Sequence, residues 1–198
     1  AASLLAKQLY YGAHYTWQTL LGNYEVAYQH SRKCLDIWEG YPLLQQERFR
    51  DYLAIFSNHI NRCYQLKRTA ELLQRLNHLR QIKAPNASLR ALTDVQIALH
   101  HLSWYELSRV YDDYEQTVKT IEQLLERPGE SVTIIEKRLL LFNIVSQFLV
   151  QGKYERALHY CVPLLQLPKS EVQTYLQRFA RLLELLLHYE SGNQQLLD

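Results

Sequence analysis

Two stretches of the chain, "GNYEVAYQH" at residues 22–30 and "GKYERALHY" at residues 152–160, share one pattern. Each begins with Gly, a polar residue, Tyr and Glu, and each has an Ala five positions after the Gly. A pattern that recurs within one chain is the sequence signature of a tandem-repeat architecture. The residues around these two stretches therefore decide the fold.

The segment around the second stretch predicts two antiparallel helices. Before the stretch, Leu141, Ile144 and Phe148 lie on one helical stripe. Gly152 stands where the C-terminal cap of a helix takes a left-handed backbone, and residues 153–167 continue with a second apolar face. Because the connection between the two helices is short, they are predicted to pack together as a hairpin.

The same cycle recurs along the chain. Turns are predicted near residues 22, 65, 112, 152 and 192, which are 43, 47, 40 and 40 residues apart. In the second hairpin, Lys67 and Ala70 take the places of the Tyr and the Ala. Segments that contain Pro or Gly, at 39–42, 84–88 and 127–131, separate the hairpins. The chain is therefore predicted to be all-α, a right-handed α-solenoid of about five hairpins that forms a single domain over residues 1–198.

The last helix is predicted over residues 169–191, with Ser170 as its N-cap and Gly192 after its end. Its hairpin is incomplete and the chain has no Met, so we expect a part of a longer polypeptide. Terminal repeats need a polar cap, but this helix has an apolar face made of Leu182, Leu183, Leu186 and Leu187. We expect the residues after 193 or a second copy of the chain to cover it, so a homo-oligomer is one outcome.

The repeated pattern, followed by a Leu pair and Pro, resembles the turn and second helix of the tetratricopeptide repeat. The best matches are Gly22, Tyr24, Ala27, Gly152, Tyr154, Ala157, Leu165 and Pro168. The standard repeat has 34 residues, so the longer spacing here implies longer helices or loops. The ending "HYESGNQQLLD" is similar to bacterial proteins of this type. The resemblance implies a non-enzymatic scaffold that binds a protein or peptide on the concave face formed by the first helices.

Composition narrows the class of protein further. With 47% hydrophobic and 21% charged residues, the chain can bury a substantial core. The longest apolar run, at 139–145, is far shorter than the roughly 20 residues of a membrane-spanning helix. No signal-peptide pattern begins the sequence, so we expect a cytoplasmic protein without membrane insertion. Cys34, Cys63 and Cys161 are odd in number and far apart, which predicts buried thiols and no disulfide framework.

Charge is uneven along the chain, although the net charge is only +2. Residues 48–90 hold nine Lys and Arg but only two acids, Asp51 and Glu71. Such a segment is either a set of solvated helix faces or a basic patch that attracts an acidic peptide, a phosphate group or RNA. The near-neutral total and the irregular repeat length make nucleic acid the less favoured partner.

No motif in the sequence demands enzymatic chemistry. The sequence has no Gly-x-Ser-x-Gly elbow, no phosphate-binding glycine loop and no dinucleotide fingerprint, so neither a catalytic residue nor a cofactor is predicted. His59 and Cys63 are one helical turn apart, but no His-Glu-x-x-His or Cys-x-x-Cys motif accompanies them. No metal site is predicted.

The tetratricopeptide resemblance also implies which residues line the groove, namely those three, six and ten places before each turn. The predicted binding residues are His59, Arg62, Glu106, Arg109, Phe142 and Ser146, with the neighbouring Asn143 available to hydrogen-bond an extended backbone. The guanidinium groups of Arg62 and Arg109 favour an acidic peptide as the partner. Two alternatives stay open: a helical-repeat RNA-binding protein, and a regulatory or sensor domain of a larger signalling or transcription-regulating protein.

Overall fold

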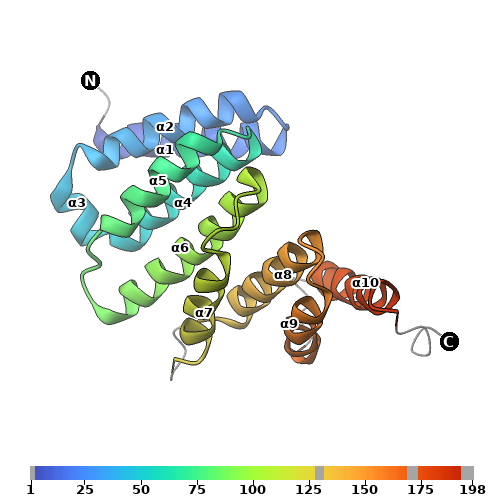
Figure 1. The fold of residues 1–198 in the computed structure, drawn as a ribbon. Coiled ribbons are helices and arrows are strands. Elements are labelled where there is room, and N and C mark those ends of the chain that lie inside the picture. The colour runs from blue at the N-terminus through green and yellow to red at the C-terminus, as the bar shows by residue number, and fades with distance from the viewer. Residues whose placement is uncertain (1–2, 128–131, 169–173, 193–198) are drawn as a thin grey trace. The chain divides into compact units, whose positions relative to one another are not determined.

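The computed structural model describes residues 3–127, 132–168 and 174–192 (Figure 1). Within these ranges the chain forms helices and no strands, which confirms the all-α prediction. The helices are α1 (Leu4–Leu20), α2 (Tyr24–Glu39), α3 (Pro42–Glu47), α4 (Phe49–Gln65), α5 (Thr69–Gln81), α6 (Ala87–Ser108), α7 (Tyr114–Leu125), α8 (Ile134–Val150), α9 (Tyr154–Gln166) and α10 (Thr174–Glu190). Ser170, the predicted N-cap of the last helix, lies outside the described residues.

The helices group into two compact units, Ala1–Arg109 and Val110–Asp198. The first unit contains α1 to α6 and the second contains α7 to α10. The two helices of the third predicted hairpin, α6 and α7, therefore belong to different units. A single domain and a right-handed solenoid over the whole chain stay predictions.

In the first unit, two successive hairpins pack together. Helix α1 packs on α2, α2 packs on α4, and α4 also contacts α5 and α6 (Figure 1). The central helix α4 buries Leu53, Phe56 and Ile60 completely or nearly so, and Leu35 of α2 and Leu72 of α5 meet them in the core. Each such side chain contributes roughly 1.5–3 kcal/mol by leaving water. The exposed residues of α4, among them Arg50, Asn61 and Gln65, lie away from this apolar stripe.

In the second unit, α8 and α9 form the predicted hairpin and α10 packs against both of them. Helix α10 turns Leu176, Ala180 and Leu187 inward. The predicted apolar face is thus partly wrong, because Leu187 is fully buried in this unit. Leu182 and Leu186 are exposed as predicted, at 60% and 42% of their surface, so an uncovered apolar stripe does exist on the described part of α10.

The predicted turns are confirmed where the sequence has a Gly. Gly22, Gly152 and Gly192 all have left-handed backbones, with φ of 75°, 69° and 74°. The backbone N–H of each donates to the carbonyl three residues earlier. Glycine accepts this conformation without steric cost, so each of these residues ends the helix before it, and after Gly22 and Gly152 the chain continues into α2 and α9.

The second turn differs from the prediction by two residues. Lys67, not Gln65, has the left-handed backbone, with φ of 55°, and its N–H donates to the Tyr64 carbonyl. In this register the place of the repeated Ala belongs to Leu72, which is fully buried, whereas Ala70 is exposed. At the end of α6, Arg109 takes the same conformation at φ of 57°, three residues before the predicted turn at 112. Because neither turn has a Gly, the sequence pattern placed the second turn two residues too early and the third turn three residues too late.

The three cysteines are free and buried, as predicted. Burial raises the pKa of the Cys34 and Cys161 thiols to about 11 and that of Cys63 to about 12. Among the residues that the structure describes, every helix is too short or too polar to span a lipid bilayer.

Candidate functional site

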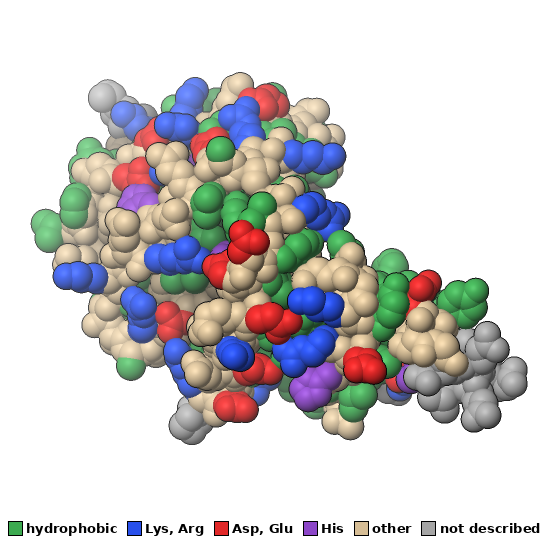
Figure 2. All heavy atoms as spheres, viewed as in Figure 1, with side chains coloured by type: hydrophobic (Ala, Val, Ile, Leu, Met, Phe, Trp, Pro, Cys, Tyr) green, Lys and Arg blue, Asp and Glu red, His purple; other side chains and the backbone are tan. Residues whose placement is uncertain are grey.

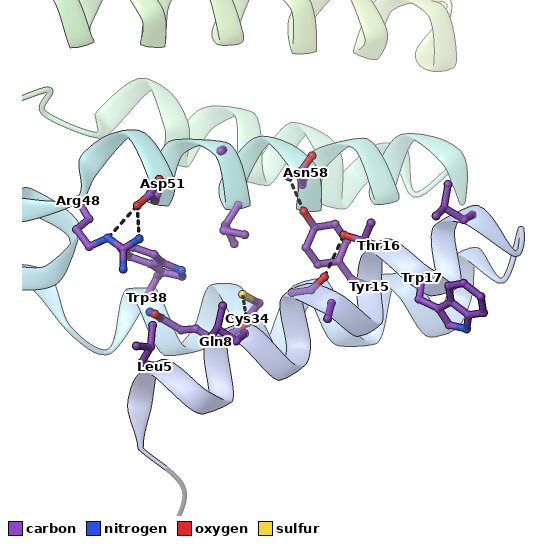
Figure 3. Close-up of a pocket in the computed structure, with 16 residues that line it drawn as sticks. Leu5, Gln8, Tyr15, Thr16, Trp17, Cys34, Trp38, Arg48, Asp51 and Asn58 are labelled. Carbon is purple, nitrogen blue, oxygen red and sulfur yellow. Dashed lines mark hydrogen bonds and ion pairs between the residues drawn. The ribbon is translucent and has the colours of Figure 1, made fainter.

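A groove runs between α1 and α4 of the first unit (Figure 3). Its volume is 630 Å³, within the range of roughly 300–1,000 Å³ that ligand-binding pockets occupy. Cys34 and Trp38 of α2 lie at its floor, and α1 and α4 form its walls. Its lining is largely apolar, so the groove can bind a ligand mainly through non-polar contacts.

The wall formed by α1 presents an open apolar stripe. Leu5 and Leu9 are one helical turn apart and line the groove, and 64% of the Leu9 surface is exposed. Gly12 continues the stripe, and a Cβ atom added there would meet no other atom within 4 Å. On the opposite wall, Ile55 of α4 also lines the groove and is only partly buried. The structure therefore leaves room beside Gly12 for apolar side chains of a ligand.

Polar contacts flank the apolar part of the groove at two places. Near one end, the Arg48 guanidinium contacts the Asp51 carboxylate, with Nε 2.8 Å from Oδ2, and lies 5.8 Å from the centre of the Trp38 ring. Further along, the Asn58 amide donates to the Tyr15 hydroxyl at 2.8 Å and joins the two walls (Figure 3). The Asn58–Tyr15 hydrogen bond joins α4 to α1, whereas the Arg48–Asp51 pair belongs to the start of α4 alone.

Gln8 supplies an unused hydrogen-bond donor in the groove. Its side chain is only 9% exposed, and its Nε2 has no hydrogen-bond partner within the described part of the chain. A buried amide without a partner costs roughly 1–3 kcal/mol. The Nε2 atom is itself buried, so a ligand carbonyl oxygen would reach it after a turn of the Gln8 side chain towards the groove, and this contact would satisfy the donor.

Two of the residues that the sequence predicted on a concave binding face, His59 and Arg62, lie on α4 but are not open to a ligand. His59 is fully buried against α2 and α5, which corrects its predicted placement on an open face. Arg62 is 8% exposed and donates from Nη1 to the Thr19 hydroxyl at 2.6 Å, so its guanidinium already bridges α4 and α1. Both residues were misplaced because the positions were counted back from Gln65, whereas the turn residue is Lys67.

The remaining predicted residues are divided between the two units. Glu106 is half-buried on α6 and accepts a hydrogen bond from Tyr64; burial, followed by this bond, raises the Tyr64 pKa to about 12. Arg109 is exposed at the end of α6. In the second unit, Phe142, Asn143 and Ser146 are half-buried on α8, and the polar pair bonds to carbonyls of its own helix. Glu106 and Arg109 thus share the first unit with His59 and Arg62, whereas the three residues of α8 belong to the second unit.

Contacts with acids neutralise four of the nine basic residues in the segment 48–90, and two more bond to neutral side chains. Its paired residues are Arg48 with Asp51, Arg62 with Thr19, Arg68 with Glu25, Arg75 with Glu39, Arg80 with Asn77 and Arg90 with Asp94. Glu25 and Glu39 come from α2, and Asp94 lies just beyond the segment on α6, so the count within the segment could not include them. On the face that Figure 2 shows, Lys and Arg side chains are interspersed with Asp and Glu. The segment is therefore a set of paired helix faces more than a continuous basic patch.

A second polar cluster lies inside the first unit, between α2, α4 and α5. Glu71 accepts a hydrogen bond from the Tyr28 hydroxyl at 2.7 Å, and His59 Nδ1 lies 3.0 Å from the Ser31 hydroxyl. Burial, with a smaller contribution from the positive charge of Arg75, lowers the His59 pKa to about 4, so this imidazole is neutral at pH 7. The Cys63 thiol lies beside them, so the cluster brings together three residue types that bind metals.

Comparison with known proteins does not extend this description. No family model matches the chain, and neither a curated protein nor a solved structure matches it.

Proposed function

We propose that the first unit is a non-enzymatic binding module that takes up a short apolar segment of a partner protein in the groove between α1 and α4. The observation that carries the proposal is the combination of open apolar walls with the unpaired amide of Gln8. This placement agrees with the tetratricopeptide resemblance, in which the first helices of neighbouring hairpins form the binding face. Helices α1 and α4 are the first helices of the first two hairpins.

The chemistry of the groove defines the segment that fits it. Leu5, Leu9 and Ile55 favour apolar side chains, because each contact removes non-polar surface from water on both partners. The Gln8 amide favours a peptide backbone, whose carbonyl groups are strong acceptors. An extended or helical segment with two or three large apolar residues meets both requirements.

An acidic peptide is less well supported than the sequence suggested. Arg62 already donates to Thr19, and the guanidinium at the groove, Arg48, already contacts Asp51. A carboxylate would have to displace these partners. The pairing of Arg68, Arg75 and Arg90 with acids likewise reduces the number of cations free to contact phosphates, which RNA binding needs.

The experiment is to select peptides on the wild-type protein from a display library of random sequences and to measure the affinity of the strongest one. Leu9→Glu places a charge on the groove wall without touching the core, and should weaken binding about tenfold or more. Leu43→Glu on α3 is the control, because Leu43 is even more exposed and does not line the groove. Peptides that bind both variants as tightly as the wild type, or a library without binders, would exclude the groove as the site.

A further inference from the structure

Three side chains that bind metals meet between α4 and α5. His59 and Cys63 lie one turn apart on α4, and Glu71 approaches them from α5. The imidazole nitrogen, the thiol sulfur and a carboxylate oxygen all lie within 4.8 Å of one another. Three atoms at these separations lie within about 2.8 Å of a common point, compared with roughly 2.0–2.3 Å for zinc bonds to nitrogen, oxygen and sulfur. Side-chain shifts of less than about 1 Å would close the difference.

The hydrogen bonds of His59 show which ring nitrogen is available. The Ser31 hydroxyl donates to the Tyr28 carbonyl at 2.8 Å, so towards His59 it acts as an acceptor. His59 Nδ1 therefore carries the proton, and Nε2 holds a free lone pair. This Nε2 is buried, has no hydrogen-bond partner among the described residues, and lies 3.7 Å from the Glu71 carboxylate. The Nε2 lone pair and the Glu71 carboxylate therefore offer two ligand atoms to a cation placed between them.

The arrangement has the supporting contact that metal-binding histidines use. A ligating His commonly donates its other ring N–H to an oxygen, which fixes the orientation of the ring. Ser31 has this role towards His59. The thiol of Cys63 would give up its proton to solvent on binding, as cysteine ligands do.

Arg32, Arg68 and Arg75 are the cations near this cluster, and Arg75 is paired with Glu39 of α2. Arg32 Nη1 lies 3.6 Å and Arg68 Nη1 lies 3.7 Å from the Glu71 carboxylate oxygens. Both side chains are partly exposed, at 48% and 36%, so they can turn into solvent when another cation takes the carboxylate. Glu71 itself is partly exposed and provides the path by which an ion would enter.

We propose that His59, Cys63 and Glu71 bind a zinc ion, with a water molecule in the fourth position. Zinc in proteins is bound by thiolate, imidazole and carboxylate groups, whereas magnesium and calcium prefer oxygen ligands alone. The ion would join α4 to α5 and would therefore stabilise the second hairpin. This site is separate from the groove, because none of its three ligands lines it.

Zinc titration of the chelator-treated protein, in competition with a colorimetric chelator, tests the proposal. The wild type should bind one equivalent, and Cys63→Ser should bind at least about tenfold more weakly. Ser31→Ala, which removes the contact to Nδ1, should weaken binding about 10–100-fold. Arg32→Gln should strengthen binding, because it removes a competing charge. The matched control is Cys161→Ser, since Cys161 is also a buried thiol but lies in the second unit.

Cobalt gives a second readout, which the wild-type protein already provides before any variant is compared. Co²⁺ added to the wild-type protein should produce the near-ultraviolet charge-transfer band of a cobalt–thiolate bond. The band should persist in Cys161→Ser and disappear in Cys63→Ser, with unchanged far-ultraviolet circular dichroism in both. A wild type that binds no zinc, cobalt binding without this band, or zinc binding that Cys63→Ser leaves unchanged would overturn the proposal.

Discussion

The Tyr28 hydroxyl of α2 donates to the Glu71 carboxylate of α5 at 2.7 Å, and the two residues are 43 positions apart in the sequence. Three further contacts between the first two hairpins have the same separation of 43: Asn58 with Tyr15, Arg62 with Thr19 and Arg68 with Glu25. A constant separation means that the hairpins meet in one fixed register along both pairs of helices. In the second unit, Tyr160 donates in the same way to Glu122 at 2.6 Å.

Tyr28→Phe tests how much this register contributes to stability. The change keeps the ring, which is 7% exposed, and removes only the hydroxyl. Because the hydrogen bond goes to a carboxylate, we expect a loss of about 1–2 kcal/mol in the free energy of unfolding. Urea denaturation should show a lower midpoint with an unchanged slope. Tyr41→Phe, at an exposed position, should leave the midpoint in place, and equal midpoints for all three proteins would contradict the assignment.

Lys67→Gly should stabilise the protein. A non-glycine residue in the left-handed region costs roughly 1–2 kcal/mol, which glycine avoids. Glycine also increases the conformational entropy of the unfolded chain, and this offsets part of the gain. We therefore expect a net gain of about 0.5–1 kcal/mol.

The comparison for this turn is Gly152→Ala, at an equivalent position with φ of 69°, which should lose about 1 kcal/mol. Thermal unfolding of both variants checks the prediction. A lower melting temperature for Lys67→Gly would show that the Lys67 side chain contributes more than its backbone costs.

His100 should make the protein less stable in acid. Burial lowers its pKa to about 4, below the ordinary value near 6.5, so the unfolded chain binds the proton more tightly than the folded one. The buried neutral imidazole therefore contributes to the free energy of unfolding in full above pH 6.5, and this contribution is lost as the pH falls towards 4. Between pH 7 and pH 5 the loss amounts to about 2 kcal/mol.

His100→Leu removes the titrating group and should reduce the pH dependence by this amount. Urea unfolding of both proteins at pH 7 and pH 5 gives the four free energies that are needed. If the wild type and His100→Leu lose the same free energy between the two values, the buried imidazole is not the cause.

The exposed stripe of α10 predicts self-association. Tyr175, Phe179, Leu182, Leu186 and Tyr189 are exposed and follow one another at intervals of 4, 3, 4 and 3 residues. This spacing is that of a helix seam in a coiled coil, so a second copy of α10 is the partner that we expect. Analytical ultracentrifugation should show a dimer that Phe179→Glu disrupts, whereas Leu43→Glu should not. A wild type that sediments as a monomer at all concentrations would contradict this prediction.

Helix positions were predictable from the sequence because apolar periodicity and glycine turns are local signals. Gly22 and Gly152 fixed the first and fourth turns correctly. Lys67 could not be recognised as a turn residue, because its left-handed backbone is imposed by the packing of the hairpin and not by its own preference. The short helix α3 was missed, although Pro42 at its start is a common first residue of a helix.

The candidate sites depended on contacts that no local pattern specifies. The two-residue error at Lys67 was enough to move His59 from a predicted groove to the protein interior. The approach of Glu71 to His59 and Cys63 is set by the way α5 packs on α4, which sequence spacing alone does not show. Leu5, Leu9 and Gly12 did carry a signal, since an apolar stripe on the first helix without a matching cover indicates a binding face.

The measurement that tests the proposed groove most directly is the peptide affinity of Gly12→Leu. A side chain here has open space, so it should fill the groove without disturbing the core, and Leu in place of Gly favours the helix by about 0.5–1 kcal/mol. We predict that Gly12→Leu loses peptide affinity about tenfold or more while its unfolding free energy does not fall, and that Gly12→Ala keeps most of the affinity. A Gly12→Leu protein that is folded and binds the selected peptide as tightly as the wild type would contradict the account.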